Sequence, residues 1–271
     1  MTVPEAIRYA ERRLLSVTDE AGTEARLMLA AISGQSPGEA AVSLRVLSDE
    51  ERERLEEMIL RRLSREPLQY LLGEWWFMGM RFRVSPAALI PRQDTETLCE
   101  EALRLIGERG YSSLLDICTG TGCIAVSLKK LAPHEISAEA SDISPEALEL
   151  AKENARLNGA EVLLRRADLF EGAGTYDIVT ANPPYISDGD MTRLQEEVRF
   201  EPRLALAGGP DGLDFYRRIA QEAPAHINSG GALLLEVGAG QAEAVAALFS
   251  GRETRIINDL NGKGRVVEVD N

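Results

Sequence analysis

The chain has 271 residues, of which 44% are hydrophobic and 27% charged, so it can bury a substantial core. Its formal net charge of −14 argues against a general nucleic-acid binder, because phosphate contacts need clustered Lys and Arg. The three cysteines lack CxxC spacing, and neither a signal peptide nor an apolar run of membrane-spanning length is present, which predicts a soluble, cytoplasmic protein. The two histidines, His134 and His226, are remote from any candidate nucleophile or ligand cluster, so we expect no metal site and no catalytic triad.

Residues 1–73 are predicted to form a small helical domain. Two segments, Ser36 to Glu39 and Ser48 to Glu51, have the Ser…Glu spacing of a capping box. An apolar stripe at helical spacing follows the second box, at Leu55, Met58, Ile59 and Leu63. We interpret this domain as a docking site for a partner, with a purely stabilising cap as the alternative.

Residues 74–91 are predicted to link this domain to the rest of the chain. Residues 74–84 are rich in aromatic and β-favouring residues around Gly79, which indicates a β-hairpin. Pro86 and Pro91 then favour an extended connector, and a helix is expected over residues 97–108.

Residues 92–271 are predicted to form an α/β domain. Apolar segments alternate with helical patterns, which is typical of a mainly parallel sheet with helices on both faces. The last two strands are separated by only a short loop, so we expect them to pair antiparallel. The predicted strands are residues 113–117, 136–141, 162–165, 176–181, 232–237, 255–257 and 265–269.

A glycine-containing loop, Cys118-Thr119-Gly120-Thr121-Gly122, connects the first of these strands to a helix. Glycines there allow the backbone to approach a ligand, and the start of the helix offers N–H groups. The loop is not the GxGxxG dinucleotide fingerprint, because Cys118 stands where a first glycine is expected, so its signal alone is weak.

Two aspartates strengthen this signal. Asp142 ends the second strand, about twenty residues after the loop, where a carboxylate accepts hydrogen bonds from a ribose diol. Asp168 follows the third strand and is placed to accept from an adenine amino group. Each alone is more often a simple turn residue, but the series of strand ends describes an adenosine ligand lying across the sheet.

The segment Asn182-Pro183-Pro184-Tyr185 follows the fourth strand. Two prolines make the backbone rigid, so that the Asn182 side chain and the Pro183 carbonyl present two acceptors for both hydrogens of a planar NH2 group. The Tyr185 ring offers a stacking face. An Asn-Pro turn without a function is the alternative.

Together these features resemble the S-adenosylmethionine-dependent methyltransferases with a Rossmann-like seven-stranded fold, in which Asn-Pro-Pro-Tyr marks enzymes that methylate planar nitrogen. Further stretches are similar to the peptide chain release factor glutamine methyltransferases, and this resemblance covers nearly the whole chain. These stretches are residues 67–74, residues 89–92 with Thr95 and Glu96, residues 197–202 and residues 208–213.

The resemblance implies methylation of the side-chain amide nitrogen (N5) of the glutamine in the Gly-Gly-Gln loop of bacterial class I release factors. It implies S-adenosylmethionine as cofactor, S-adenosylhomocysteine as product, and a monomer. Asn182, Pro183 and Tyr185 would be catalytic, and Asn182 to Tyr185, Pro184 included, would hold the glutamine. The implied cofactor-binding residues are Cys118, Thr119, Gly120, Thr121, Gly122, Asp142, Asp168, Leu169 and Asn182.

There are three departures from the family pattern, namely Cys118 in place of glycine, Gln93-Asp94 in place of Pro-Glu, and Leu169 in place of an aromatic residue. None removes a group that the mechanism needs. One alternative function is nucleic-acid adenine-N6 methylation, since Asn-Pro-Pro-Tyr suits an exocyclic amino group equally well. The other is a non-catalytic cofactor-binding protein, against which the presence of Asn182 and Tyr185 argues.

Overall fold

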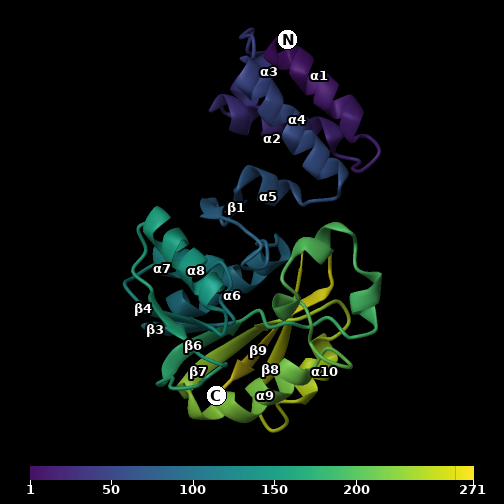
Figure 1. The fold of residues 1–271 in the computed structure, drawn as a ribbon. Helices are drawn as coiled ribbons and strands as arrows, with labels where there is room; N and C mark the ends of the chain where they lie inside the picture. The colour runs from purple at the N-terminus through teal and green to yellow at the C-terminus, as the bar shows by residue number, and fades with distance from the viewer. Residues whose placement is uncertain (260) are drawn as a thin grey trace. The chain divides into compact units, whose positions relative to one another are not determined.

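The computed structural model describes residues 1–259 and 261–271, and these form two compact units. The first consists of Met1–Glu74 together with Gln195–Phe200, and the second of Trp75–Leu194 and Glu201–Asn271. Figure 1 shows that the first unit consists mainly of helices and the loops between them, whereas the second contains the large sheet. None of the described helices is long and apolar enough to cross a membrane.

The helical unit contains five short helices around one apolar core. Both predicted capping boxes form, because Ser36 accepts a hydrogen bond from the Glu39 amide at 3.3 Å and Ser48 accepts one from the Glu51 amide at 3.2 Å. Apolar residues of all five helices build the core, although α3 contributes only Ala40. The helices are α1 (Val3–Leu14), α2 (Ala21–Ser33), α3 (Pro37–Val42), α4 (Asp49–Leu63) and α5 (Leu68–Leu72).

The segment Gln195–Phe200, which contains the turn η2 (Glu197–Phe200), belongs to the helical unit although it lies far along the chain. Its Glu197 carboxylate forms ion pairs with Arg62 at 3.0 Å and with Arg65 at 3.2 Å. Arg62 is buried and also pairs with Glu24 at 2.8 Å. A buried guanidinium needs such partners, so these pairs explain why the segment stays with the helices.

The predicted hairpin is formed by β1 (Glu74–Phe77) and β2 (Met80–Arg83), and all of it except Glu74 belongs to the second unit. Its two-residue turn has positive φ at both positions, 49° at Met78 and 73° at Gly79. This geometry matches the twist of the two strands. The Met78 amide also donates to Glu96 at 2.7 Å, which ties the turn to helix α6.

The large sheet has seven strands in the order β5-β4-β3-β6-β7-β9-β8. Strands β3 to β7 pair in parallel, whereas β9 is antiparallel to both β7 and β8. The predicted α/β class, the mainly parallel sheet and the closing antiparallel pair are therefore confirmed. The strands are β3 (Ser113–Ile117), β4 (Ser137–Asp142), β5 (Leu163–Arg166), β6 (Tyr176–Ala181), β7 (Ile227–Glu236), β8 (Thr254–Asn258) and β9 (Gly264–Asp270).

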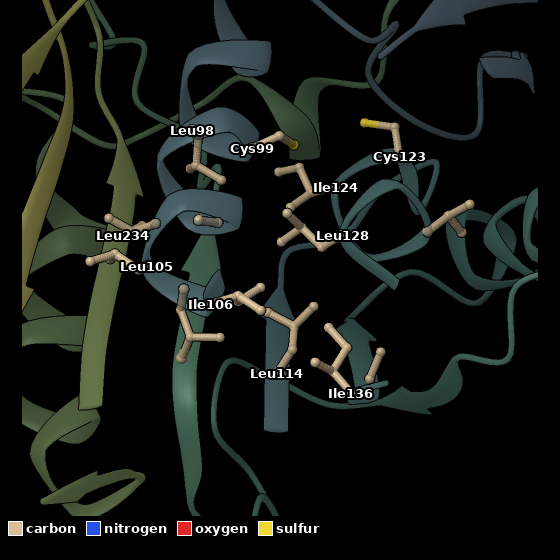
Figure 2. Packing of buried hydrophobic residues seen from close by; sticks show 14 of the residues in the cluster. Leu98, Cys99, Leu105, Ile106, Leu114, Cys123, Ile124, Leu128, Ile136 and Leu234 are labelled. Carbon is tan, nitrogen blue, oxygen red and sulfur yellow. The ribbon is translucent and has the colours of Figure 1, made fainter. Parts of the chain in front are cut away.

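Helices cover both faces of this sheet. Neighbouring residues of one strand therefore pack into two different apolar clusters, one on each face. Leu114 and Leu234 pack with α6 and α7, as Figure 2 shows, whereas Leu115 and Leu235 pack with α9 and α10. The helices are α6 (Asp94–Arg109), α7 (Cys123–Leu131), α8 (Pro145–Leu157), α9 (Asp214–Glu222) and α10 (Ala242–Ala247), with short turns η1 (Asp190–Arg193), η3 (Arg203–Ala205) and η4 (Ala223–Ala225).

Candidate active site

A cavity of about 210 Å³ lies at the carboxyl ends of β3, β4 and β6. Open α/β sheets bind ligands at this edge, where helix starts and strand ends meet. Its walls come from the connector at residues 87–92, the loop after β3, the ends of β4 and β5, and helix α9. The walls are largely apolar, with the carboxyl groups of Asp142 and Asp168 and the amide of Asn182 among their polar groups.

The predicted glycine loop forms part of the wall, and its backbone has the left-handed conformation at Cys118 (φ 56°), Gly120 (φ 54°) and Gly122 (φ 77°). This conformation explains why a glycine is expected at the Cys118 position. Gly122 does not line the cavity but allows helix α7 to approach α8, since a Cβ there would lie 3.0 Å from the Ala151 Cβ. Cys118, Thr119, Gly120 and Thr121 do line the cavity.

A buried carboxyl group, Asp116 of β3, stabilises this loop through a hydrogen bond to Thr119. Its two oxygens accept hydrogen bonds from the Thr119 hydroxyl at 2.6 Å and the Thr180 hydroxyl at 2.8 Å. Complete burial raises the pKa of Asp116 to about 7, although both hydroxyls favour its ionised form. We did not predict this role, for which an aspartate inside an apolar strand is the only local signal.

Asp142 lies at the cavity wall, and both of its oxygens are held by backbone amides. The Gly120 amide donates to Oδ2 and the Ser144 amide donates to Oδ1, each at 2.9 Å. Burial raises the pKa of Asp142, and these two amides oppose that rise. The carboxylate is therefore fixed in place, and each oxygen retains lone pairs for hydroxyl groups of a ligand.

Asp168 and Leu169 also line the cavity. Asp168 forms an ion pair with Arg218 of α9 at 3.0 Å, a partner that we did not foresee. Leu169 is buried and has a φ of 52°, a conformation that is costly for a leucine and persists only when its surroundings impose it. Leu169 contributes an apolar surface to the cavity that Asp142 and Asp168 also line.

Asn182 and Pro184 line the cavity, and Pro183 and Tyr185 are their neighbours in the chain. The Asn182 Nδ2 group donates a long hydrogen bond of 3.4 Å to the Thr95 hydroxyl of α6. No described residue donates to the other end of the amide, Oδ1. Thr95 is buried and contributes to the same wall, although we predicted no role for its side chain.

Tyr185 is held in place by its backbone and by close packing. Its carbonyl accepts a hydrogen bond from Gln241 at 3.0 Å. Gly208 passes directly against it, so the glycines of residues 208–213 allow close approach of two backbones. Burial raises the pKa of Tyr185 to about 12, so its hydroxyl remains protonated at neutral pH.

Parts of two further stretches that suggested the family, residues 89–92 and 201–202, also lie at this cavity. Glu201 is buried, accepts a hydrogen bond from the Ile90 amide at 2.9 Å and forms an ion pair with Arg92. Ile90, Arg92 and Pro202 all line the cavity. Glu201 thus fastens the connector before α6 to the chain that follows Asn182-Tyr185.

Comparisons with known proteins identify relatives of this chain. Residues 5–73 match the family model of the PrmC N-terminal domain, and residues 101–200 match that of the methyltransferase small domain. A release factor glutamine methyltransferase of Geobacter sulfurreducens is 48% identical over 216 residues, which cover 78% of this chain and 75% of that protein. One of Cereibacter sphaeroides is 41% identical over 278 residues, covering 98% of both chains.

The fold also resembles a solved structure, a methyltransferase from Pyrococcus furiosus. The TM-score is 0.53 at 17% identity, and the match covers 82% of this chain and 98% of the other. At that identity the likeness concerns the fold alone.

Proposed function

Because this chain belongs to the release factor glutamine methyltransferase family, we propose that it methylates the side-chain amide nitrogen of the glutamine in the Gly-Gly-Gln loop of bacterial class I release factors. The observation that carries the proposal is the position of Asn182 in the cavity wall, with its NH2 group turned towards Thr95. That orientation directs the amide oxygen at a substrate, where it can accept hydrogen bonds from an NH2 group.

We propose that this cavity binds S-adenosylmethionine, which would supply an electrophilic methyl group on a sulfonium. Asp142 would accept hydrogen bonds from the ribose hydroxyls, since its carboxylate is fixed by two backbone amides. The apolar side chain of Leu169 would lie beside the adenine. Cys118, Thr119, Gly120 and Thr121 would surround the rest of the molecule, and Gly122 would maintain the loop.

The residues after β6 would prepare the substrate nitrogen for attack. An amide nitrogen is a poor nucleophile because its lone pair is delocalised into the carbonyl group. Asn182 Oδ1 and the Pro183 carbonyl would accept its two hydrogens and orient the nitrogen. Positive charge develops on the nitrogen as it attacks, so these acceptors bind the transition state more strongly than the ground state.

Proton release requires no strong base in this scheme. The methylated amide carries positive charge and is acidic, so it can lose a proton to solvent after transfer. Tyr185 is not suited to act as a base, because its pKa is about 12 and its hydroxyl stays protonated. Its ring would instead provide packing for the glutamine side chain.

We assign docking of the release factor to the helical domain, residues 1–73, with residues 74–91 as the linker and residues 92–271 as the catalytic domain. The protein would act as a cytoplasmic monomer without binding nucleic acid directly. The family model that matches residues 5–73 supports a separate role for this domain. A docking domain accounts for selection of a whole protein substrate, which the small cavity does not provide by itself.

The test is methyl transfer from labelled S-adenosylmethionine to a purified bacterial release factor. The matched control is the same factor with the Gly-Gly-Gln glutamine changed to alanine, and DNA is offered as a third substrate. Label on the unmodified factor alone supports the proposal. Label on DNA would instead support adenine methylation, and cofactor binding without any transfer would support a non-catalytic protein.

A further inference from the structure

Glu236 is a buried carboxyl group directly behind the Asn182 wall of the cavity. Strands β6 and β7 pair in parallel with Ala181 opposite Leu235, so the next residues, Asn182 and Glu236, are neighbours at the same sheet edge. Glu236 is 1% exposed and does not line the cavity. Its Oε2 atom has no hydrogen-bond partner among the described residues. An unpartnered buried carboxyl oxygen costs stability and calls for an explanation.

Two polar groups, the Thr95 hydroxyl and the Asn182 amide, link Glu236 to the cavity. The Asn182 NH2 group donates to the Thr95 hydroxyl at 3.4 Å, so the Thr95 oxygen serves as acceptor and its proton is directed elsewhere. Both the Thr95 hydroxyl and the Asn182 amide stabilise the ionised form of Glu236. The Thr95 proton, which is not used in the contact with Asn182, is therefore available for donation to Glu236.

The direction of these hydrogen bonds, from donor to acceptor, decides which end of the Asn182 amide faces the cavity. An ionised carboxylate can only accept hydrogen bonds, so it orients the Thr95 proton and the Asn182 NH2 group towards itself. The Asn182 oxygen is then left for the substrate NH2 group. If the Asn182 amide were reversed, its oxygen would face the Glu236 carboxylate. Its NH2 group would then face the NH2 group of the substrate, so that donors would meet donors.

We propose that Glu236 is a positioning residue, which acts through Thr95 to hold the Asn182 carboxamide with its oxygen facing the cavity. This inference rests on the proposed function, because it concerns the orientation of the acceptor for the substrate amide. A protonated Glu236 can donate a hydrogen bond and no longer enforces that orientation.

The surroundings of Glu236 make its ionisation sensitive to pH near neutrality. Burial raises its pKa to about 7, against the opposing effects of Thr95, Arg265 and Asn182. Arg265 is itself paired with Asp94 at 2.9 Å and Asp259 at 3.3 Å, so its charge is shared. The titratable and charged groups that face Glu236 are Asp94 and Cys99 of α6, Cys123 of α7, Tyr185, Tyr216 of α9 and Arg265 of β9.

The experiment measures single-turnover methyl transfer to the release factor at saturating S-adenosylmethionine, from about pH 5.5 to about pH 9. The wild-type rate is expected to rise as pH rises through about 7. The Glu236→Gln enzyme should lose this rise, because its neutral amide does not titrate, and should be about tenfold slower at the upper end. Any increase in rate with pH that is due to Asp116 occurs in both enzymes. The difference between the pH profiles of the wild type and Glu236→Gln therefore reports the ionisation of Glu236.

Three further variants guard against a purely structural effect. Thr95→Ser keeps the hydroxyl and should retain the wild-type profile, whereas Thr95→Val keeps the shape and should behave like Glu236→Gln. Glu268→Gln removes another buried carboxylate, on β9, that pairs with Arg109 and Arg255 instead. It should retain the wild-type pH profile.

The outcomes separate this inference from the proposed function. A Glu236→Gln enzyme with the wild-type rate and profile would overturn the role of Glu236 while methyl transfer stands. If Glu236→Gln fails to fold, equal rates and profiles for Thr95→Val and Thr95→Ser overturn it instead. No transfer by the wild type at any pH would remove the proposed function and this inference with it.

Discussion

The backbone of Gly208 lies so close to Tyr185 that a Cβ atom at residue 208 would be 2.7 Å from the Tyr185 Cα and 2.8 Å from the Pro184 carbonyl oxygen. A side chain at residue 208 would therefore force the segment after Asn182 to move. The chain of residues 208–213 therefore acts as a support for the backbone that presents the substrate acceptors.

Gly208→Ala should consequently reduce methyl transfer by about tenfold or more, because a small displacement of a positioning group is costly in rate. We also expect a loss of about 1–3 kcal/mol in the free energy of unfolding, as for other overpacked sites. Single-turnover kinetics and denaturant unfolding measure the two effects. Gly189→Ala is the matched control in the same stretch of chain, where a Cβ would meet nothing closer than 3.8 Å, and it should leave both quantities near the wild-type values.

Asn182→Ala should slow methyl transfer on the order of a hundredfold or more, by analogy with the loss of one preorganised polar group. The reason is that one of the two acceptors for the substrate NH2 group is removed. The rate is measured under single-turnover conditions with saturating methyl donor, which separates chemistry from cofactor affinity. A mutant rate within a few-fold of the wild type would refute the role of this side chain.

Asp142→Asn should weaken binding of S-adenosylhomocysteine, by about tenfold to hundredfold, because hydrogen bonds to a charged acceptor are lost. The new NH2 group would also face either the Gly120 amide or the Ser144 amide, both of which are donors. Isothermal titration calorimetry gives the affinity. Asp177→Asn changes an aspartate at the opposite end of the sheet, where it accepts from the Ser112 amide, and should bind normally. Equal affinities for the two variants would show that Asp142 does not contact the ligand.

The raised pKa of Asp116 predicts how stability depends on pH. Its folded-state pKa of about 7 lies above the ordinary value of 3.8, so the folded protein holds a proton that the unfolded chain releases between these values. This contribution is fully present below about pH 3.8 and is lost as pH rises through about 7. Asp116→Asn removes it.

The free energy of unfolding of Asp116→Asn relative to wild type should therefore rise steadily across that window. Chemical denaturation at a series of pH values measures the difference, in which all other carboxyl groups cancel. A difference that is constant with pH would mean that Asp116 is ionised normally in the folded protein.

Local patterns predicted most of the fold, because capping boxes and hydrophobic periodicity act over a few residues. The Ser48 to Glu51 box and the strand Tyr176–Ala181 were both predicted with the right bounds. Strand β7 was predicted from residue 232 but begins at Ile227. Its first part contains Gly230 and Gly231, which resemble a turn, and it pairs with β6 through an irregular register that no local pattern reveals.

Contacts between distant segments account for what was missed at the site. Glu236 was predicted only as part of a strand, since its position beside Asn182 depends on β6 and β7 being neighbours in the sheet. Likewise, Arg218 reaches Asp168 from a helix fifty residues further along the chain, and Glu197 joins Arg62 across 135 residues. Such pairs follow from tertiary structure and leave no periodic signal in the sequence.

The most direct measurement is peptide mass spectrometry of a release factor after incubation with S-adenosylmethionine and either the wild-type enzyme or Asn182→Ala. The account predicts a single methyl group on the side chain of the Gly-Gly-Gln glutamine with the wild type, and little or none with the variant in the same time. Methylation of another residue, or equal methylation of the glutamine by both enzymes, would contradict it.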